Sequence, residues 1–130
     1  MKINPSHLLL VFRCSFILAM ALITYGSLVN VSELPDVTVK VWDKFQHASA
    51  FLLLSFLLHR SFPDKPLFSR SHIAQIIFLF GYGVTIEWLQ SYTPNREGSI
   101  GDIVADSFGI ICYTLLYLKN HSGQSSPQGG

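Results

Sequence analysis

Four blocks of apolar residues, each about as long as a membrane-spanning helix, constrain this chain more than any other feature. They predict spans at about residues 7–29, 42–60, 71–90 and 102–118. A helix that crosses the hydrocarbon core of a bilayer needs about 20 mostly apolar residues. The chain is 49% hydrophobic and only 13% charged, which is unusual for a small soluble domain. The sequence therefore predicts an integral membrane protein.

The predicted spans are helices, so the expected fold class is all-α, a four-helix transmembrane bundle. A β-barrel would need segments of about ten residues in which apolar and polar residues alternate, and the apolar blocks do not alternate. A helix also satisfies its own backbone hydrogen bonds in lipid. The chain of 130 residues has room for one domain, which we place at residues 1–119. Residues 120–130 are rich in Ser, Gln and Gly, and we predict a disordered tail.

The distribution of charge predicts the orientation of the bundle. Four spans place both termini and the connection between the second and third spans on one side. That side carries six cations and one acid, namely Lys2, Arg13, Arg60, Lys65, Arg70, Lys119 and Asp64. The other side carries three cations and seven acids, namely Lys40, Lys44, Arg96, Glu33, Asp36, Asp43, Glu87, Glu97, Asp102 and Asp106. Because Lys and Arg concentrate in cytoplasmic loops, both termini are expected in the cytoplasm.

Polar residues gather at the ends of three spans on the acidic side. An antiparallel path brings the start of the second span, the end of the third and the start of the fourth together. Residues three or four apart share a helix face, so each span presents several of these groups in one direction. The sequence predicts a ligand-binding site at the extracytoplasmic face, formed by Asp43, Lys44, His47, Glu87, Gln90, Arg96, Asp102 and Asp106.

Several of these residues also have a structural interpretation. Asp43 and Asp102 stand near predicted helix N-termini, where a carboxylate can cap free N–H groups. Lys44 occupies the position of a flanking charge and Trp42 that of an interfacial aromatic residue. Glu87 lies about one turn inside an apolar span, where an ionisable group is costly unless it faces protein or water. Glu87 is therefore the strongest single candidate for a functional residue.

The order and spacing of the polar residues resemble the VanZ-like family of small bacterial membrane proteins. The resemblance lies in the motifs Asp43-Lys44-x-x-His47, Glu87-x-x-Gln90, Arg96 and Asp102-x-x-x-Asp106-x-x-Gly109. It covers about residues 42–118, and Asp106 stands where that family usually has Asn. The resemblance implies a multi-pass protein of the cell inner (cytoplasmic) membrane. It also implies a cell-envelope setting, because the founding member is associated with low-level resistance to the glycopeptide teicoplanin.

Three functions stay open for the predicted site, and the sequence does not decide whether the protein is an enzyme. The first, which we favour, is binding of a lipid or cell-envelope precursor headgroup, with Lys44 and Arg96 contacting a phosphate or carboxylate. The second is a membrane-embedded enzyme that acts on a phosphorylated lipid, with His47 or Glu87 as base. Such an enzyme could use a divalent cation held by His47, Glu87, Asp102 and Asp106. The third is a proton or ion relay.

Membrane lipids are the expected partners of this chain. It contains no basic patch and no glycine-rich phosphate loop, so we expect no nucleic-acid partner. Cys14 and Cys112 lie inside apolar blocks and show no metal-binding spacing. The sequence leaves the ligand and the oligomeric state undecided.

Overall fold

The computed structural model describes residues 4–29, 36–62, 66, 68–94 and 96–122, and of residues 36–40 the backbone alone. Four α-helices make up the fold: α1 (Pro5–Leu28), α2 (Asp36–Arg60), α3 (Arg70–Gln90) and α4 (Ile100–Ser122). These residues contain no β-strand, so the predicted all-α class is confirmed. Lys2, Glu33, Asp64 and Lys65, which entered the charge count, lie outside the described residues.

The helices differ in how well they suit a bilayer. By length and composition, α1, α3 and α4 are apolar enough to cross a membrane. Helix α2 is not among them, because its first half carries Asp43, Lys44 and His47 as well as apolar residues. It also begins six residues earlier than the span predicted at 42–60, since hydropathy gives no signal for a polar extension of a helix. The fourth span and the location of the termini therefore stay predictions.

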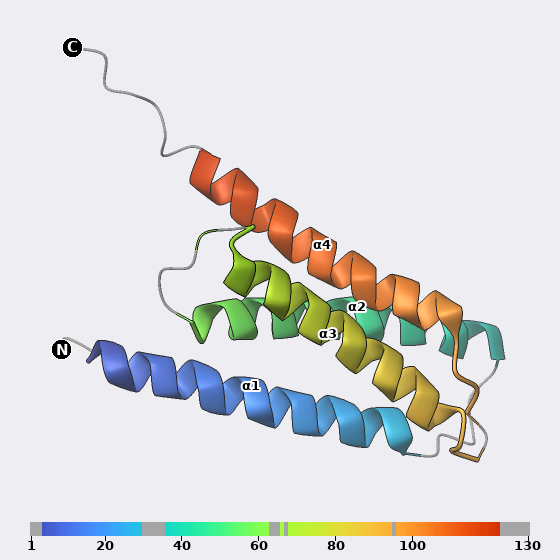
Figure 1. The fold of residues 1–130 in the computed structure, drawn as a ribbon. Helices are drawn as coiled ribbons and strands as arrows, with labels where there is room; N and C mark the ends of the chain where they lie inside the picture. Colours follow the sequence, from blue (N-terminus) through green and yellow to red (C-terminus); the bar gives the residue numbers. More distant parts are fainter. Residues whose placement is uncertain (1–3, 30–35, 63–65, 67, 95, 123–130) are drawn as a thin grey trace, which may run out of the picture.

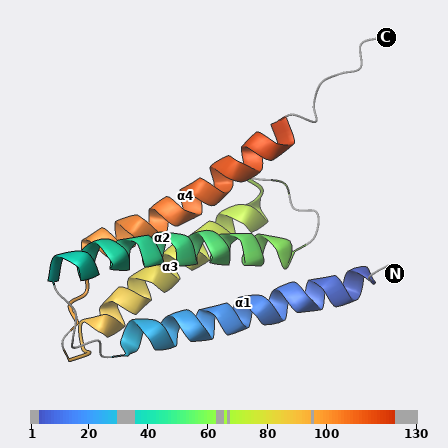
Figure 2. The ribbon, with the colours of Figure 1, turned by 180° about the vertical axis from the view of Figure 1, so that it is seen from behind.

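The four helices run side by side with alternating direction (Figure 1). The N-terminus of α1 and the C-terminus of α4 lie toward the same end of the bundle, and the view from behind shows the same arrangement (Figure 2). Helices α2 and α4 make the most extensive contact. At Gly109, a Cβ atom would collide with the Ala48 carbonyl oxygen and come within 2.9 Å of the Leu52 nitrogen. Glycine at this position lets the two backbones touch, as small residues do between membrane helices.

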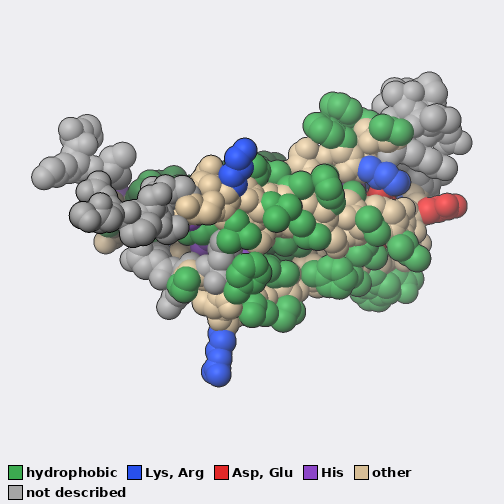
Figure 3. Space-filling model, turned by 90° about the horizontal axis from the view of Figure 1, so that it is seen from above, with side chains coloured by type: hydrophobic (Ala, Val, Ile, Leu, Met, Phe, Trp, Pro, Cys, Tyr) green, Lys and Arg blue, Asp and Glu red, His purple; other side chains and the backbone are tan. Residues whose placement is uncertain are grey.

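An apolar layer fills the middle of the bundle. Phe51 and Leu54 of α2 pack there with Leu79 of α3, and all three are at most 2% exposed. Helix α1 is peripheral, since Phe16 is its one buried residue. Large hydrophobic side chains cover much of the outer surface between the two ends (Figure 3). This pattern is expected of helices that face lipid rather than water.

Candidate functional site

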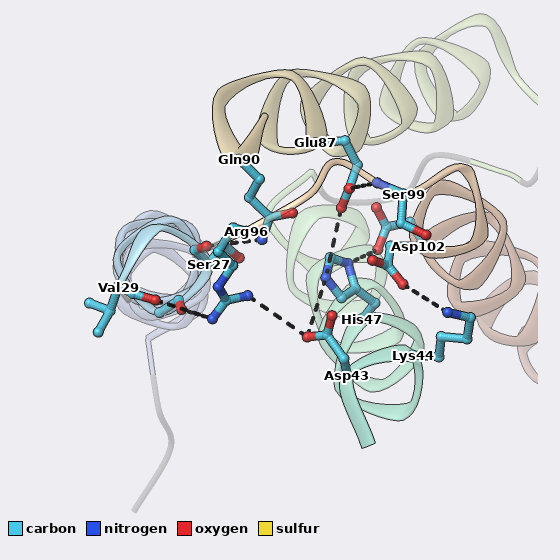
Figure 4. A network of polar contacts seen from close by, with 12 residues as sticks. Ser27, Val29, Asp43, Lys44, His47, Glu87, Gln90, Arg96, Ser99 and Asp102 are labelled. Carbon is cyan, nitrogen blue, oxygen red and sulfur yellow. Dashed lines mark hydrogen bonds and ion pairs between the residues drawn. The ribbon is translucent and has the colours of Figure 1, made fainter. Parts of the chain in front are cut away.

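His47 is the centre of a charged cluster at the end of the bundle where α1 and α3 end and α4 begins (Figure 4). Its Nδ1 atom lies 2.8 Å from Asp106 Oδ1, a hydrogen bond that joins α2 to α4. Its Nε2 atom lies 3.8 Å from Glu87 Oε1 on α3 and 4.0 Å from Asp43 Oδ1. These two separations are longer than a hydrogen bond. Three helices therefore bring a carboxylate each to one imidazole.

Helical spacing explains how α2 and α4 present these groups. Asp43 and His47 are four residues apart on α2, as are Asp102 and Asp106 on α4, so each pair shares a helix face. Because α2 begins at Asp36, Asp43 lies about two turns inside the helix and does not cap it. Asp102 lies in the first turn of α4, where its negative charge suits the helix dipole.

Glu87 is 4% exposed, and its two carboxylate oxygens differ. Oε2 accepts a hydrogen bond of 2.7 Å from the backbone N–H of Ser99, whereas Oε1 has no hydrogen-bond partner among the described residues. Glycine at position 98 lets the loop approach Glu87 this closely, because a Cβ atom there would lie only 2.6 Å from the Glu87 carbonyl oxygen. Ser99 and Gly98 were not predicted as site residues. A backbone N–H donor cannot be recognised from the spacing of polar side chains in the sequence.

Asp106 Oδ2 is the second buried carboxylate oxygen without a hydrogen-bond partner in the described structure. It lies against α3 at Gly83, where a Cβ atom would come within 2.6 Å of it. Glycine at position 83 therefore makes room for the carboxylate. Gly83 was not among the predicted site residues.

Lys44 lies at the rim of the cluster and is its most exposed charged side chain. Its Nζ atom is 3.5 Å from Asp102 Oδ1, and 49% of the side chain is exposed. The ammonium group also lies over the start of α4, because a Cβ at Gly101 would be 3.2 Å from Nζ. Lys44 thus adds positive charge to the positive end of the α4 dipole.

Gln90 and Arg96 point toward the end of α1. Gln90 Nε2 donates to the Ser27 carbonyl oxygen at 2.9 Å, and Arg96 Nη2 donates to the carbonyls of Gly26 and Val29 at 3.4 and 3.3 Å. The last carbonyl groups of a helix have no partner within it, so these contacts complete α1 and hold it against the bundle. Arg96 Nη1 also lies 4.0 Å from Asp43 Oδ1. Both side chains are thus engaged in holding α1.

The arrangement of ligand-type atoms suits a positively charged group. Two sets of three side chains each place one ligand atom within 4.8 Å of the others. One set is Asp43, His47 and Asp102, and the other is His47, Glu87 and Asp106. Seven of the eight predicted site residues form an ion pair or hydrogen bond with another member of the cluster, whereas the Gln90 side chain bonds to Ser27 of α1.

A second polar cluster, which the sequence analysis did not identify, lies at the opposite end of the bundle. There His59 Nδ1 is 2.7 Å from the Tyr113 hydroxyl, and His72 Nδ1 accepts from the Phe68 N–H at 3.1 Å. Gln75 Nε2 is buried without a partner in the described part of the chain, beside a cavity with room for about one water molecule. Antiparallel spans that lie side by side meet at both ends. The sequence could therefore have indicated this second cluster from the polar residues at the other ends of the same spans.

The apolar layer separates the two clusters. Phe51, Leu54 and Leu79 lie between them in the order of residues along α2 and α3. The relay function stays a prediction.

These features define an all-helical, multi-pass membrane protein with a charged site at one end of its bundle. The profile of the VanZ/LLP1 family matches residues 7–120, so the chain belongs to the VanZ-like family. The family predicted from the sequence motifs is thereby confirmed. Comparisons with curated proteins and with solved structures gave no match.

Proposed function

We propose that this protein binds the phosphate-bearing headgroup of a lipid or cell-envelope precursor at the charged end of its bundle. In this proposal all four helices span the inner membrane, both termini lie in the cytoplasm, and the charged cluster faces outward. A link to glycopeptide tolerance, teicoplanin included, is part of the proposal and rests on family membership alone.

The Lys44 side chain, which is half exposed and ends in an ammonium group, is the observation that carries this proposal. It is 3.5 Å from Asp102 and stands over the first turn of α4, beside Gly101. A cation next to a helix N-terminus is a favourable environment for a phosphate group. Gly101 has no side chain to obstruct an approaching headgroup. The buried groups behind Lys44 are suited to orient hydroxyl or amide groups of the same ligand.

Exposed aromatic residues support a position at the membrane interface. Trp42, Trp88 and Tyr92 are exposed and belong to the same end of the bundle, near the start of α2 and the end of α3. Trp and Tyr are enriched at the level of the lipid headgroups. Lys44 would then lie at the depth of those headgroups.

Cations at the opposite end support a cytoplasmic location for it. Arg60 ends α2, Arg70 begins α3, and Lys119 lies in the last turn of α4. Arg13 joins them, since its Nε donates to the Ser61 carbonyl oxygen at 3.2 Å, just beyond α2. This clustering agrees with the positive-inside rule.

Lipid binding by the purified protein tests the proposal. Native mass spectrometry would compare phosphatidylglycerol and a polyprenyl phosphate with neutral phosphatidylcholine. We expect selective binding of the two anionic lipids, and roughly tenfold weaker binding in Lys44→Met, because one charge-assisted contact is lost. Lys119→Met removes a lysine from the opposite end and is the matched control.

Two outcomes would contradict headgroup binding at this site. One is equal affinity for Lys44→Met and wild-type protein, and the other is an equal loss in Lys119→Met. Either result would show that Lys44 has no special role in the interaction.

A second candidate function, an enzyme that acts on a phosphorylated lipid, is favoured by the pair formed by His47 and Asp106. A carboxylate within 2.8 Å of one imidazole nitrogen can orient the other nitrogen for acid–base chemistry. Release of inorganic phosphate from the polyprenyl phosphate in the same samples, lost in Glu87→Gln, would favour the enzyme. Stable binding without release would favour the headgroup site.

A further inference from the structure

We propose that the charged cluster holds a divalent transition-metal ion, Mn²⁺ or Zn²⁺, between His47 Nε2 and Glu87 Oε1. This inference deepens the proposed function by naming what anchors the headgroup. The ion site itself is argued from the geometry alone, and only its contact with a phosphate rests on the proposed function.

The first step concerns the protonation of His47. Its Nδ1 atom lies 2.8 Å from Asp106 Oδ1, and an ionised carboxylate can only accept a hydrogen bond. In the tautomer that donates from Nδ1 to Asp106, the lone pair of Nε2 is free to bind a cation. Histidines that bind metals through one ring nitrogen usually donate the other N–H to a carboxylate or carbonyl in this way. Asp106 acts here as a positioning residue.

The second step concerns the atoms around that lone pair. Glu87 Oε1 is 3.8 Å away and Asp43 Oδ1 is 4.0 Å away, and neither distance is a hydrogen bond. Ligand atoms bonded to one ion at about 2.0–2.2 Å lie roughly 3–4 Å apart. The separation of His47 Nε2 and Glu87 Oε1 therefore fits two ligands that share a single small cation, whereas Asp43 belongs to a different set of mutually close ligand atoms.

The third step concerns the unpartnered oxygen. Glu87 is 4% exposed, and Oε1 has no hydrogen-bond partner among the residues described. A buried carboxylate oxygen without a partner is unfavourable, and a bound cation removes that cost. The other oxygen, Oε2, is fixed by the Ser99 N–H at 2.7 Å, so Oε1 is held facing His47.

The donor set selects the class of ion. Calcium takes six to eight oxygen ligands, whereas an imidazole with a carboxylate suits zinc or manganese. Asp102 is nearby but is paired with Lys44 at 3.5 Å, so it stays outside the set. Two protein ligands leave coordination positions open. A phosphate oxygen could occupy one of them while Lys44 contacts the same phosphate from the rim.

Mn²⁺ binding by lipid-depleted protein in neutral detergent tests the site. Titration followed by electron paramagnetic resonance should show one Mn²⁺ bound per chain, with competition by Zn²⁺. We expect Glu87→Gln to weaken binding at least tenfold and Asp106→Asn to weaken it by roughly 10–100-fold, as loss of an orienting partner does. Matched controls are Glu97→Gln, an exposed glutamate, and His72→Gln, a histidine at the opposite end, and both should bind Mn²⁺ normally.

A measurement on the wild-type protein covers the case in which a variant does not fold. Pulsed electron paramagnetic resonance should detect coupling between bound Mn²⁺ and an imidazole nitrogen. This coupling should be lost or reduced in Asp106→Asn, which a merely structural role of Asp106 would not predict. Absence of Mn²⁺ binding, absence of nitrogen coupling or unchanged binding in Glu87→Gln would overturn the proposal.

Failure of the metal site and failure of headgroup binding are distinguishable. Lys44→Met should bind Mn²⁺ like the wild type while it loses affinity for anionic lipid. Anionic lipid that binds equally well with and without a chelator, in protein that takes up no Mn²⁺, would refute the ion and leave headgroup binding intact.

Discussion

The two ends of the bundle both contain buried polar groups, but they differ in charge and in how their groups are paired. At the charged end, His47 stands among the carboxylates of Asp43, Glu87 and Asp106, and two carboxylate oxygens lack hydrogen-bond partners among the described residues. At the other end, His59 is bonded to the neutral hydroxyl of Tyr113. The comparison shows that the buried polar groups of the two ends differ in how completely the described residues satisfy them.

The second polar cluster, which contains His59, His72 and Tyr113, has the properties of a structural network. His72 Nδ1 accepts a backbone N–H, and its ring lies with its centroid 5.5 Å from that of His59. One amide nitrogen, that of Gln75, is unpartnered in the described part of the chain, and a single water molecule in the adjacent cavity would satisfy it. Among the described residues, this second cluster contains no buried carboxylate.

The largest expected change in the free energy of unfolding comes from a variant that separates α2 from α4, because this contact supports both clusters. Both histidine pairs join α2 to α4, and Gly109 lies between Asp106 and Tyr113 on α4. Gly109→Leu would drive its side chain into the α2 backbone and should lower the free energy of unfolding by about 3 kcal/mol or more. Reversible unfolding in mixed micelles, followed by circular dichroism, measures this change.

Gly81→Leu is the matched control for that variant. A Cβ at Gly81 meets no atom within 4 Å, and the residue is exposed on α3. We expect it to leave the free energy of unfolding unchanged or slightly higher, since leucine favours a helix more than glycine. Equal destabilisation by both leucines would show that the contact between α2 and α4 is not the critical one.

An intermediate effect is expected from a change in the second polar cluster alone. Tyr113→Phe removes the hydroxyl bonded to His59 and should lower the free energy of unfolding by about 1–2 kcal/mol, the cost of a lost buried hydrogen bond. Because this network is remote from the charged end, Mn²⁺ affinity should not change. A loss of Mn²⁺ affinity would mean that the two ends are coupled and that our contrast between them is wrong.

The smallest effect is expected at the rim of the charged end. Lys44 is half exposed and 3.5 Å from Asp102, so Lys44→Met should change the free energy of unfolding by only about 0.5 kcal/mol. The same micelle unfolding assay, without added lipid, measures it. A change several times larger would assign Lys44 a structural role and weaken the case that it contacts a headgroup.

Much of the architecture could be predicted because apolar blocks determine where helices form in lipid. The convergence of Asp43, Glu87 and Asp102 followed from counting spans, since alternate helix ends must share a side. The four-residue spacing of Asp102 and Asp106 also gave the correct shared face. These inferences need only periodicity and connectivity.

Other parts of the site could not be predicted, because backbone groups leave no sequence motif. The N–H of Ser99 fixes Glu87, and carbonyl groups at the end of α1 accept from Gln90 and Arg96. Spacing marked those two side chains as polar neighbours of the site, but it could not show that they hold α1. The early start of α2 at Asp36 was missed for a related reason, since a helix that continues into polar sequence has no hydropathy signal.

The contact between Asp106 Oδ2 and Gly83 has an evolutionary consequence. The niche at Gly83 fixes the shape of the side chain at position 106 but offers no donor that would require a carboxylate. Asparagine is isosteric with aspartate, and its oxygen could still accept from the imidazole. Selection could therefore exchange oxygen for nitrogen at one atom and retune the formal charge of the whole site without repacking any helix.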